Sequence, residues 1–471
     1  MSRRQQWLTL IVFSVANFFS AACISVMAPF YPHEAESKGA TATQYGLVFG
    51  ISQLVTFIVS PLYGAYIKQI GPKFLLNTGV LMSAVTCIIF GHLHYINDPD
   101  LFIGFSFVVR IIGALGTAAV PAVSFSYVTM EFSGNSGSAF ACVETMFGLG
   151  LVIGPAVGGV LYGYGGFTLP FLVVGFAQFF TSCVSCTLLP PLNDHSEYGT
   201  DDLSIWDAIR IPSVLIYIYT IFVCAFSIGW YESILEPHLR PFNLTPSYLG
   251  LIFIFDGIAY SITTPIWGRL TDKVITPRTA NIICGIIGMI SFLFLGPAPF
   301  FKIPTTVALC IGSLVTCGVA FGGLLVGSFN GMLNDIFRNG FPDDLSAYSI
   351  ITGIFNSSFA FGMFSGASCS GIMMDTIGFD WGAVIVAALY FIAVMLHGGY
   401  NLYFYVRRFS SKKYSLTEYI HTTESDRLDD IIRNQKSCYG TIHHDESDLE
   451  DSFKSQIMNG FCLKSLVIDC K

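Results

Sequence analysis

Long apolar stretches separated by short polar segments dominate the chain. Twelve of them approach or exceed the ~20 residues that a helix needs to cross a bilayer. The predicted spans are residues 7–31, 44–67, 74–96, 101–130, 137–163, 168–190, 212–236, 246–270, 278–297, 304–333, 345–374 and 381–406. One long polar segment, 193–210, divides them six and six. We therefore expect an all-α membrane protein with an N-terminal bundle (1–192), a cytoplasmic linker (193–211), a C-terminal bundle (212–406) and a disordered cytoplasmic tail (407–471).

Positive charges predict the orientation, because cytoplasmic loops of membrane proteins are enriched in Lys and Arg. If the N-terminus is cytoplasmic, the opposite side carries only three of these residues: Lys38, Arg240 and Lys302. The cytoplasmic side then carries thirteen: Arg3, Arg4, Lys68, Lys73, Arg210, Arg269, Lys273, Arg278, Arg338, Arg407, Arg408, Lys412 and Lys413. Both termini are thus predicted to be cytoplasmic. The first apolar run lacks a small-residue cleavage site, so we interpret it as a span and not as a signal peptide.

The amino-acid composition argues against several classes of function. Only 11% of the residues are charged, against about 25% in soluble domains, and much of the net charge of −8 comes from the residues after Lys413. The chain has no basic, aromatic-interleaved face, which argues against nucleic acid as a partner. It also shows no nucleophile–base pair, metal cluster or phosphate loop, so we expect no enzyme activity and no cofactor. The CxxC pair Cys183 and Cys186 lies within a span without a second pair, and we expect ordinary membrane-helix cysteines.

Two loops that lie six spans apart have similar sequences. GAYIKQIGPK runs from Gly64 to Lys73 after the second span, and GRLTDKVI runs from Gly268 to Ile275 after the eighth. Duplication of a six-helix half is typical of transporters built around a midplane site.

These loops and the architecture resemble the major facilitator superfamily, in its drug:proton antiporter branch. That family's gating loop has a glycine, an Asp followed by Arg or Lys, and a second glycine. Gly268, Asp272 and Lys273 fit, but Ile275 replaces the second glycine. In the first loop Gly64 and Gly71 fit, while Lys68 stands at the acidic position. The departure at Lys68 puts the family's gating ion pair in question.

The fifth span contains GLVIGPAVGG, which matches the antiporter pattern GxxxGPxxGG at Gly150, Gly154, Pro155, Gly158 and Gly159. Small residues allow close helix packing, and an internal proline permits a kink. We expect this helix at the seam between the two halves, although an ordinary small-residue packing face would give the same pattern. RIIGALGTAA, beginning at Arg110, resembles the family's Arg-containing motif in the fourth span.

A charged group within the membrane is costly and indicates a functional site. The spans contain Arg110, Glu144, Glu232, Glu236 and Asp256. Glu232 and Glu236 are four residues apart and share a helix face. Arg110 could pair with Glu144, and Glu236 could simply be solvated at its helix end. Because acids outnumber the single Arg, we expect a net negative cavity suited to protons or a cation. Three aromatic residues could add cation–π faces: Trp230, Tyr231 and Tyr260.

Within the superfamily the chain most resembles the vesicular amine transporters. The resemblance covers NFFSAACISVMAPFYP from Asn17, YGLVFGISQLVTFIVSPLYG from Tyr45, and Leu235-Glu236-Pro237. It implies substrate and proton handling for Glu236 and substrate contact for Tyr260, and it places Asn17 near the site.

The departures from the monoamine members point to a different substrate. Where those transporters have membrane-embedded charged residues, this chain has Ala16, Ser52, Gly327 and Asn356. Glu144, Glu232 and Asp256 take the place of the single amine anchor. Several separated acids suit a longer, multiply charged cation, so the chain resembles the vesicular polyamine transporter branch.

We therefore expect a proton-coupled antiporter that loads polyamines or related organic cations into an acidic secretory or synaptic vesicle. A less selective exporter of organic cations at the plasma membrane would carry the same motifs. A transport-inactive sensor or interaction protein using the long tail is a third alternative. The tail contains Tyr439-Gly440-Thr441-Ile442, which fits a sorting signal read by adaptors, and Asn243-Leu244-Thr245 is a sequon on the predicted lumenal side.

Overall fold

The computed structural model describes residues 3–189, 204–242 and 246–438; within these ranges, some side chains, including Glu236 and those of 404–438, lie outside the described part. The longer helices are α1 (Arg3–Ser25), α3 (Ala42–Ile70), α4 (Pro72–His92), α5 (Pro99–Glu131), α6 (Ser136–Gly165), α7 (Thr168–Leu188), α9 (Pro212–Leu239), α10 (Pro246–Lys273), α11 (Pro277–Leu295), α12 (Val307–Arg338) and α13 (Leu345–Cys438). Short helices α2 (Tyr31–Ser37) and α8 (Ile205–Ile209) complete the set of described α-helices.

Eleven described helical segments are long and apolar enough to cross a membrane. They coincide with eleven of the predicted spans to within a few residues at most ends. The remaining prediction, residues 246–270, corresponds to helix α10, whose first residues have undescribed side chains. The chain is therefore an all-helical, multi-pass membrane protein.

The first span is shorter than predicted. The range 7–31 ends six residues late, because α1 stops at Ser25 and a turn leads into α2 at Tyr31. Pro29 lies in that turn, and a proline in a helix interior lacks the N–H donor and clashes with the preceding turn. Pro32 then occupies the first turn of α2, where proline is tolerated.

Local sequence signals set the helix ends. Thr41 and Gln44 form a reciprocal capping box at the start of α3, which satisfies two otherwise unpaired backbone donors. Gly71 separates α3 from α4 with a φ of 90°, a conformation that glycine adopts without steric penalty. Gly378, with a φ of 79°, similarly interrupts α13. The last two predicted spans thus meet at a glycine.

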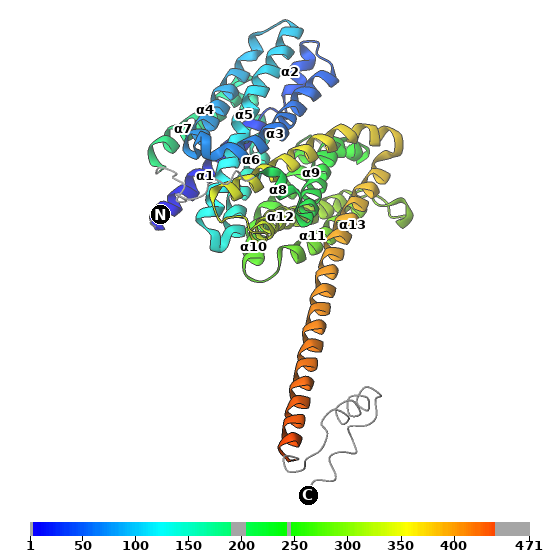
Figure 1. The fold of residues 1–471 in the computed structure, drawn as a ribbon. Coiled ribbons are helices and arrows are strands. Elements are labelled where there is room, and N and C mark those ends of the chain that lie inside the picture. Colours follow the sequence, from blue (N-terminus) through cyan, green and yellow to red (C-terminus); the bar gives the residue numbers. More distant parts are fainter. Residues whose placement is uncertain (1–2, 190–203, 243–245, 439–471) are drawn as a thin grey trace. The chain divides into compact units, whose positions relative to one another are not determined.

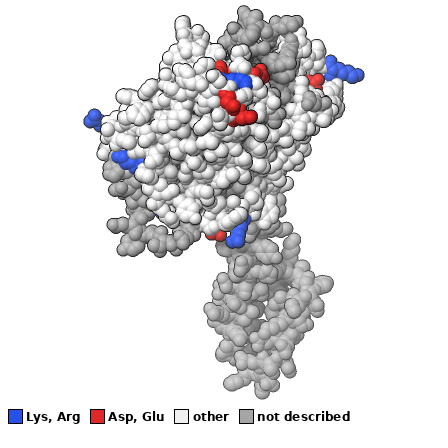
Figure 2. Space-filling view, turned by 90° about the horizontal axis from the view of Figure 1, so that it is seen from above, with Lys and Arg blue, Asp and Glu red and all other residues white. Residues whose placement is uncertain are grey.

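The helices gather in two groups (Figure 1). In the first group α1 packs on α6, and α4 packs on α5 and α7; in the second, α12 packs on α9, α10 and α11. Contacts between α6 and α10 join the groups. The described surface in Figure 2 shows few charged side chains, as expected for helices that face lipid.

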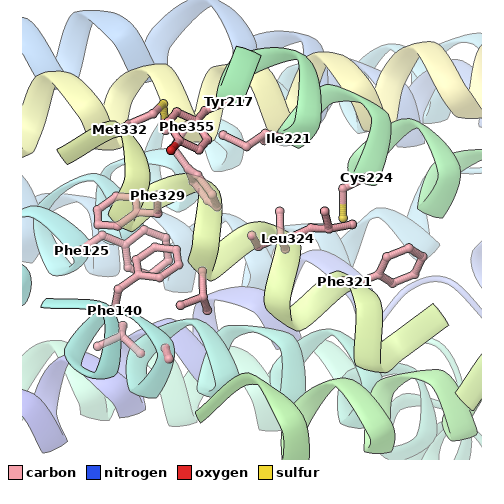
Figure 3. Packing of buried hydrophobic residues seen from close by; sticks show 14 of the residues in the cluster. Phe125, Phe140, Tyr217, Ile221, Cys224, Phe321, Leu324, Phe329, Met332 and Phe355 are labelled. Atoms are coloured by element: carbon pink, nitrogen blue, oxygen red, sulfur yellow. The ribbon is translucent and has the colours of Figure 1, made fainter. Parts of the chain in front are cut away.

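A layer of four buried phenylalanines also joins the groups (Figure 3). Phe140 of α6 stacks on Phe329 of α12, with ring centroids 4.0 Å apart and ring planes 7° apart. Phe125 of α5 and Phe355 of α13 pack edge-on against Phe140 at 4.9 and 5.2 Å. We call these residues the Phe layer. Because these rings come from different helices of the bundle, the layer packs the two groups against each other at this level.

Candidate functional site

Two tyrosine–carboxylate hydrogen bonds link three helices. The hydroxyl of Tyr260 on α10 donates to Glu144 Oε1 on α6 at 2.9 Å. The hydroxyl of Tyr231 on α9 donates to Asp256 Oδ2 on α10. Asp256 and Tyr260 are four residues apart and therefore lie on one face of α10. The structure thus brings together three of the predicted site residues, Glu144, Asp256 and Tyr260, across the junction of the two helix groups.

Neither of these carboxylates has a basic partner in the part of the chain that the structure describes. Glu144 is 5% exposed, and Asp256 Oδ1 is buried without a hydrogen-bond partner. Among the described residues, neither acid takes part in an ion pair. A buried carboxylate without a compensating charge is costly. A proton or a cationic ligand would remove that cost.

Glycines make room for this site. A Cβ at Gly148 would overlap the Tyr260 ring, and a Cβ at Gly318 would lie 2.9 Å from Asp256 Oδ1. The absence of side chains at these two positions lets α6 and α12 approach α10 closely enough for the polar contacts.

The other predicted acidic and aromatic residues lie in different environments. Glu232 is exposed on α9, one residue after the buried Tyr231. Glu236 lies in α9, but its side chain is outside the described residues. Trp230 does not line a cavity, contrary to the sequence-based expectation, because it is fully buried against Phe292 and Phe379. On a helix the residue next to a cavity-facing position points elsewhere.

Arg110 lies apart from the acids. The sequence suggested an Arg110–Glu144 pair, but no such ion pair occurs among the described residues. The Arg110 Nη1 atom instead donates to the carbonyl of Ile24 at 3.4 Å. Asn17 is fully buried, and its amide donates to the carbonyl of Phe13 within α1 at 2.8 Å. Among the described residues no hydrogen bond or ion pair joins Arg110 or Asn17 to Glu144 or Asp256.

The first loop motif does form an ion pair, with a partner that the sequence analysis missed. Lys68 Nζ lies 2.6 Å from Asp344 Oδ2, just before α13. Gly64, one turn earlier on α3, accepts a hydrogen bond at its carbonyl from Ser349 of α13 at 2.8 Å. Asp344 also accepts from the backbone N–H of Ala347. An Asp immediately before a helix is an N-cap signal, and this was the available clue to Asp344.

The second loop motif makes the matching contact. Asp272 accepts from the backbone N–H groups of Gly137 and Ser138 at 2.9 and 2.8 Å, and from the Ser138 hydroxyl at 2.6 Å. A carboxylate at a helix N-terminus satisfies unpaired donors and is stabilised by the helix dipole. A Cβ at Gly268 would lie 2.8 Å from the Gly137 carbonyl. Lys273 is exposed.

The two loop motifs therefore join the two helix groups at two places. In each case a glycine on one helix lets a partner helix from the other group approach, and a charged residue four positions later binds the start of that partner. The pairs are α3 with α13 and α10 with α6. We call the Lys68–Asp344 and Asp272–Ser138 contacts the loop locks.

The helix that carries the antiporter motif, α6, lies at the seam as expected, since it contacts α10, but the motif glycines themselves pack on α1. Cβ atoms at Gly150, Gly154 and Gly158 would collide with Phe18, Ser25 and Val26 of α1 or the end that follows it. These glycines thus pack α6 against α1 inside the first group, not at the seam between the groups. The seam contacts of α6 come from Gly148 and Val152, which meet α10. Pro155 lies inside α6, and Gly159 is exposed with open space beside it.

The positions that differ from the monoamine pattern carry no charge in this structure. Ala16 is fully buried, Ser52 and Asn356 are buried, and a Cβ at Gly327 would meet Asn281. The sequon Asn243-Leu244-Thr245 and the tail motif Tyr439-Gly440-Thr441-Ile442 lie outside the described residues.

Paired helix groups with a buried acidic site at their junction define a multi-pass membrane transporter. The family model for the Major Facilitator Superfamily matches residues 13–350 and 221–418. The human MFS-type transporter SLC18B1 is 32% identical over 90% of this chain and 92% of its own length. The rat chromaffin granule amine transporter is 24% identical over 73% of this chain and 63% of its own length.

A crystal structure of a bacterial homologue of the iron transporter ferroportin, in an outward-facing state, shares the fold. Its TM-score is 0.67 at 11% identity, covering 84% of this chain and 99% of that one. The chain belongs to the major facilitator superfamily, in the family that includes SLC18B1 and the vesicular amine transporters. It is a transporter and not an enzyme.

Proposed function

We propose that this protein exchanges protons for polyamines or related organic cations by alternating access. The observation that carries the proposal is the buried Glu144, which accepts a hydrogen bond from Tyr260 and has no basic partner among the described residues. Relatedness to amine transporters supports a cationic substrate.

Competition for one carboxylate supplies the coupling. A buried carboxylate is stabilised by a proton or by an ammonium group, but it gains little from both at once. Binding of the amine therefore favours release of the proton, and arrival of the proton favours release of the amine. Glu144 serves as this exchange site, with Asp256 as the second acid on α10.

A polyamine suits more than one acid. Glu144, Asp256 and Glu232 come from three helices, so successive ammonium groups of one extended molecule would find separate partners. Glu236 is proposed as a further acid along the same helix as Glu232. Tyr260 positions Glu144, and Tyr231 positions Asp256.

The loop locks and the Phe layer close one end of the transporter. By the positive-inside rule this is the cytoplasmic end, so the proposed state opens its site toward the lumen. Both termini would then be cytoplasmic, and an acidic vesicle would supply the protons. Opening the cytoplasmic end requires that both loop locks separate.

Uptake into proteoliposomes tests this function. The purified full-length protein is reconstituted with an acidic interior, and uptake of labelled spermidine is measured before and after a protonophore collapses the gradient. We expect gradient-dependent uptake that is lost in Glu144→Gln and reduced in Glu236→Gln. Folded protein without gradient-dependent uptake would contradict proton coupling.

The same preparation separates the alternatives. Equal competition by serotonin and by structurally unrelated organic cations would favour a broad-specificity exporter, which the shared drug:proton motif supports. Spermidine binding without flux would favour a transport-inactive sensor. Adaptor binding through the tail is tested separately by Tyr439→Ala and its effect on vesicle targeting.

A further inference from the structure

A small cavity lies in the first helix group, separate from the acidic site. Its volume is about 30 Å³, enough for about two waters at roughly 10–15 Å³ of probe-occupied volume each. The cavity is bordered by α1, α3, α4, α5 and α7. Its polar lining comprises Cys23, Ser52, Ser83, Thr86, Arg110 and Thr117, together with Cys87. No Asp or Glu lines it.

Arg110 brings a positive charge to this cavity, and no acidic side chain in the described part of the chain forms an ion pair with it. Its Nε atom is buried and has no hydrogen-bond partner. Its Nη1 atom donates a long hydrogen bond to the Ile24 carbonyl near the end of α1, at 3.4 Å. The C-terminus of a helix carries roughly half a negative elementary charge, so this contact leaves the guanidinium only partly compensated. Because Arg stays protonated in proteins, it cannot shed the charge.

Ser52 adds a second unused donor. Its hydroxyl oxygen is buried without a partner, and Ser52 and Arg110 line the same cavity from α3 and α5. By contrast, the hydroxyls of Ser83 and Thr86 donate to carbonyls of their own helix at 2.9 and 2.8 Å. Two unsatisfied donors, one of them from a charged group, therefore line the same cavity.

We propose that this cavity binds one chloride ion. A small monovalent anion would accept hydrogen bonds from Arg110 and Ser52 and would neutralise the guanidinium charge. Leaving the buried Nε donor of this charged group without a partner is unfavourable, which gives the anion its affinity. The small volume selects a halide over sulfate or an organic carboxylate. The site is independent of the exchange at Glu144.

Chloride dependence of stability tests the site. The full-length protein in lipid nanodiscs is unfolded thermally in chloride and in gluconate at equal ionic strength. A ligand that binds only the native state raises the Tm with its concentration. We expect a saturable increase with chloride and bromide and none with sulfate. Radiolabelled chloride should bind at one site per chain.

Two serine variants localise the effect. Ser52→Ala removes a donor to the anion, and a hydrogen bond to a charged group contributes about 1.5 kcal/mol or more, so chloride affinity should fall about tenfold. Ser124→Ala is the matched control, because Ser124 is also buried and unpartnered on α5 but does not line the cavity. Arg110→Gln should abolish the response.

Two results would overturn the proposal. Equal chloride affinity in the Ser52→Ala and Ser124→Ala proteins would place the anion elsewhere. Absence of saturable chloride binding to the wild-type protein would show that no anion compensates Arg110 and that water fills the cavity.

Discussion

Lys68 and Asp344, separated by 276 positions in the sequence, form a 2.6 Å ion pair between α3 and the start of α13. The pair reverses the charge arrangement of the family's gating loop, in which the acid stands on the loop. The loop of the second half keeps the acidic residue of the family's motif: Asp272 binds the backbone at the start of α6. One loop lock is thus an ion pair, and the other is a carboxylate at a helix N-terminus.

The Lys68–Asp344 pair predicts non-additive effects in a double-mutant cycle. Lys68→Met and Asp344→Asn should each lower spermidine uptake, and the double variant should lose little more than the more damaging single one. Asn keeps an acceptor for the Ala347 N–H, so the helix cap is retained. Because the Lys68 and Asp344 side chains are 30% and 12% exposed, we expect effects of only a few-fold, as for an ion pair of ~1 kcal/mol.

Lys73→Met is the matched control for this cycle. Lys73 lies in the same loop, but its ammonium donates to the carbonyl of Leu189 at 2.6 Å within the first helix group. Additive losses in the Lys68 and Asp344 variants, or an equal loss in Lys73→Met, would show that the pair does not control opening.

Tyr260→Phe should weaken spermidine transport without removing it. The ring continues to fill the space beside Gly148, while the hydrogen bond to Glu144 is lost. Such bonds to charged groups contribute about 1.5–3 kcal/mol, so the apparent KM should rise about tenfold or more. Tyr219→Phe is the control, since its hydroxyl donates to the Leu389 carbonyl at 3.2 Å. An unchanged KM in Tyr260→Phe would remove Tyr260 from the site.

Two glycines of the antiporter motif should respond differently to substitution by alanine, so that one serves as the control for the other. Gly150→Ala should lower the Tm, because its Cβ would overlap the Phe18 carbonyl of α1 and overpacking costs roughly 1–3 kcal/mol. Gly159→Ala should leave the Tm nearly unchanged, because nothing lies within 4 Å of its Cβ position. Differential scanning fluorimetry of both variants measures this. Similar Tm values for the two would contradict the α1–α6 packing.

The Phe layer predicts a shift in conformation. Phe329→Ala removes a contact between the helix groups, whereas Phe292→Ala removes contacts with Trp230, Tyr231 and Tyr390 inside the second group. Both should destabilise the fold by about 3–5 kcal/mol. Only Phe329→Ala should increase hydrogen–deuterium exchange at the starts of α6 and α13. Equal exchange in the two variants would show that the layer is not a closure.

The membrane spans, the repeated loop and the membrane-embedded acids could be predicted from the sequence. The residues that contact these acids and loops became known only from the structure. Apolar stretches and capping signals such as Thr41–Gln44 act locally, so they could be predicted. The end of α1 was misplaced because a hydropathy pattern continues through Pro29. The separation of Arg110 from Glu144, and the pairing of Lys68 with Asp344, depend on how distant helices pack. The hydrophobic periodicity of one sequence does not show which distant helices pack together.

Proton release on substrate binding tests the central claim most directly. Spermidine is added to the purified protein in a weakly buffered, slightly acidic solution, and the change in pH is recorded at saturation. The exchange at Glu144 predicts that the wild-type protein and the control Glu36→Gln release protons, while Glu144→Gln binds spermidine more weakly and releases fewer. Equal proton release from Glu144→Gln and the wild-type protein would contradict the proposed exchange site.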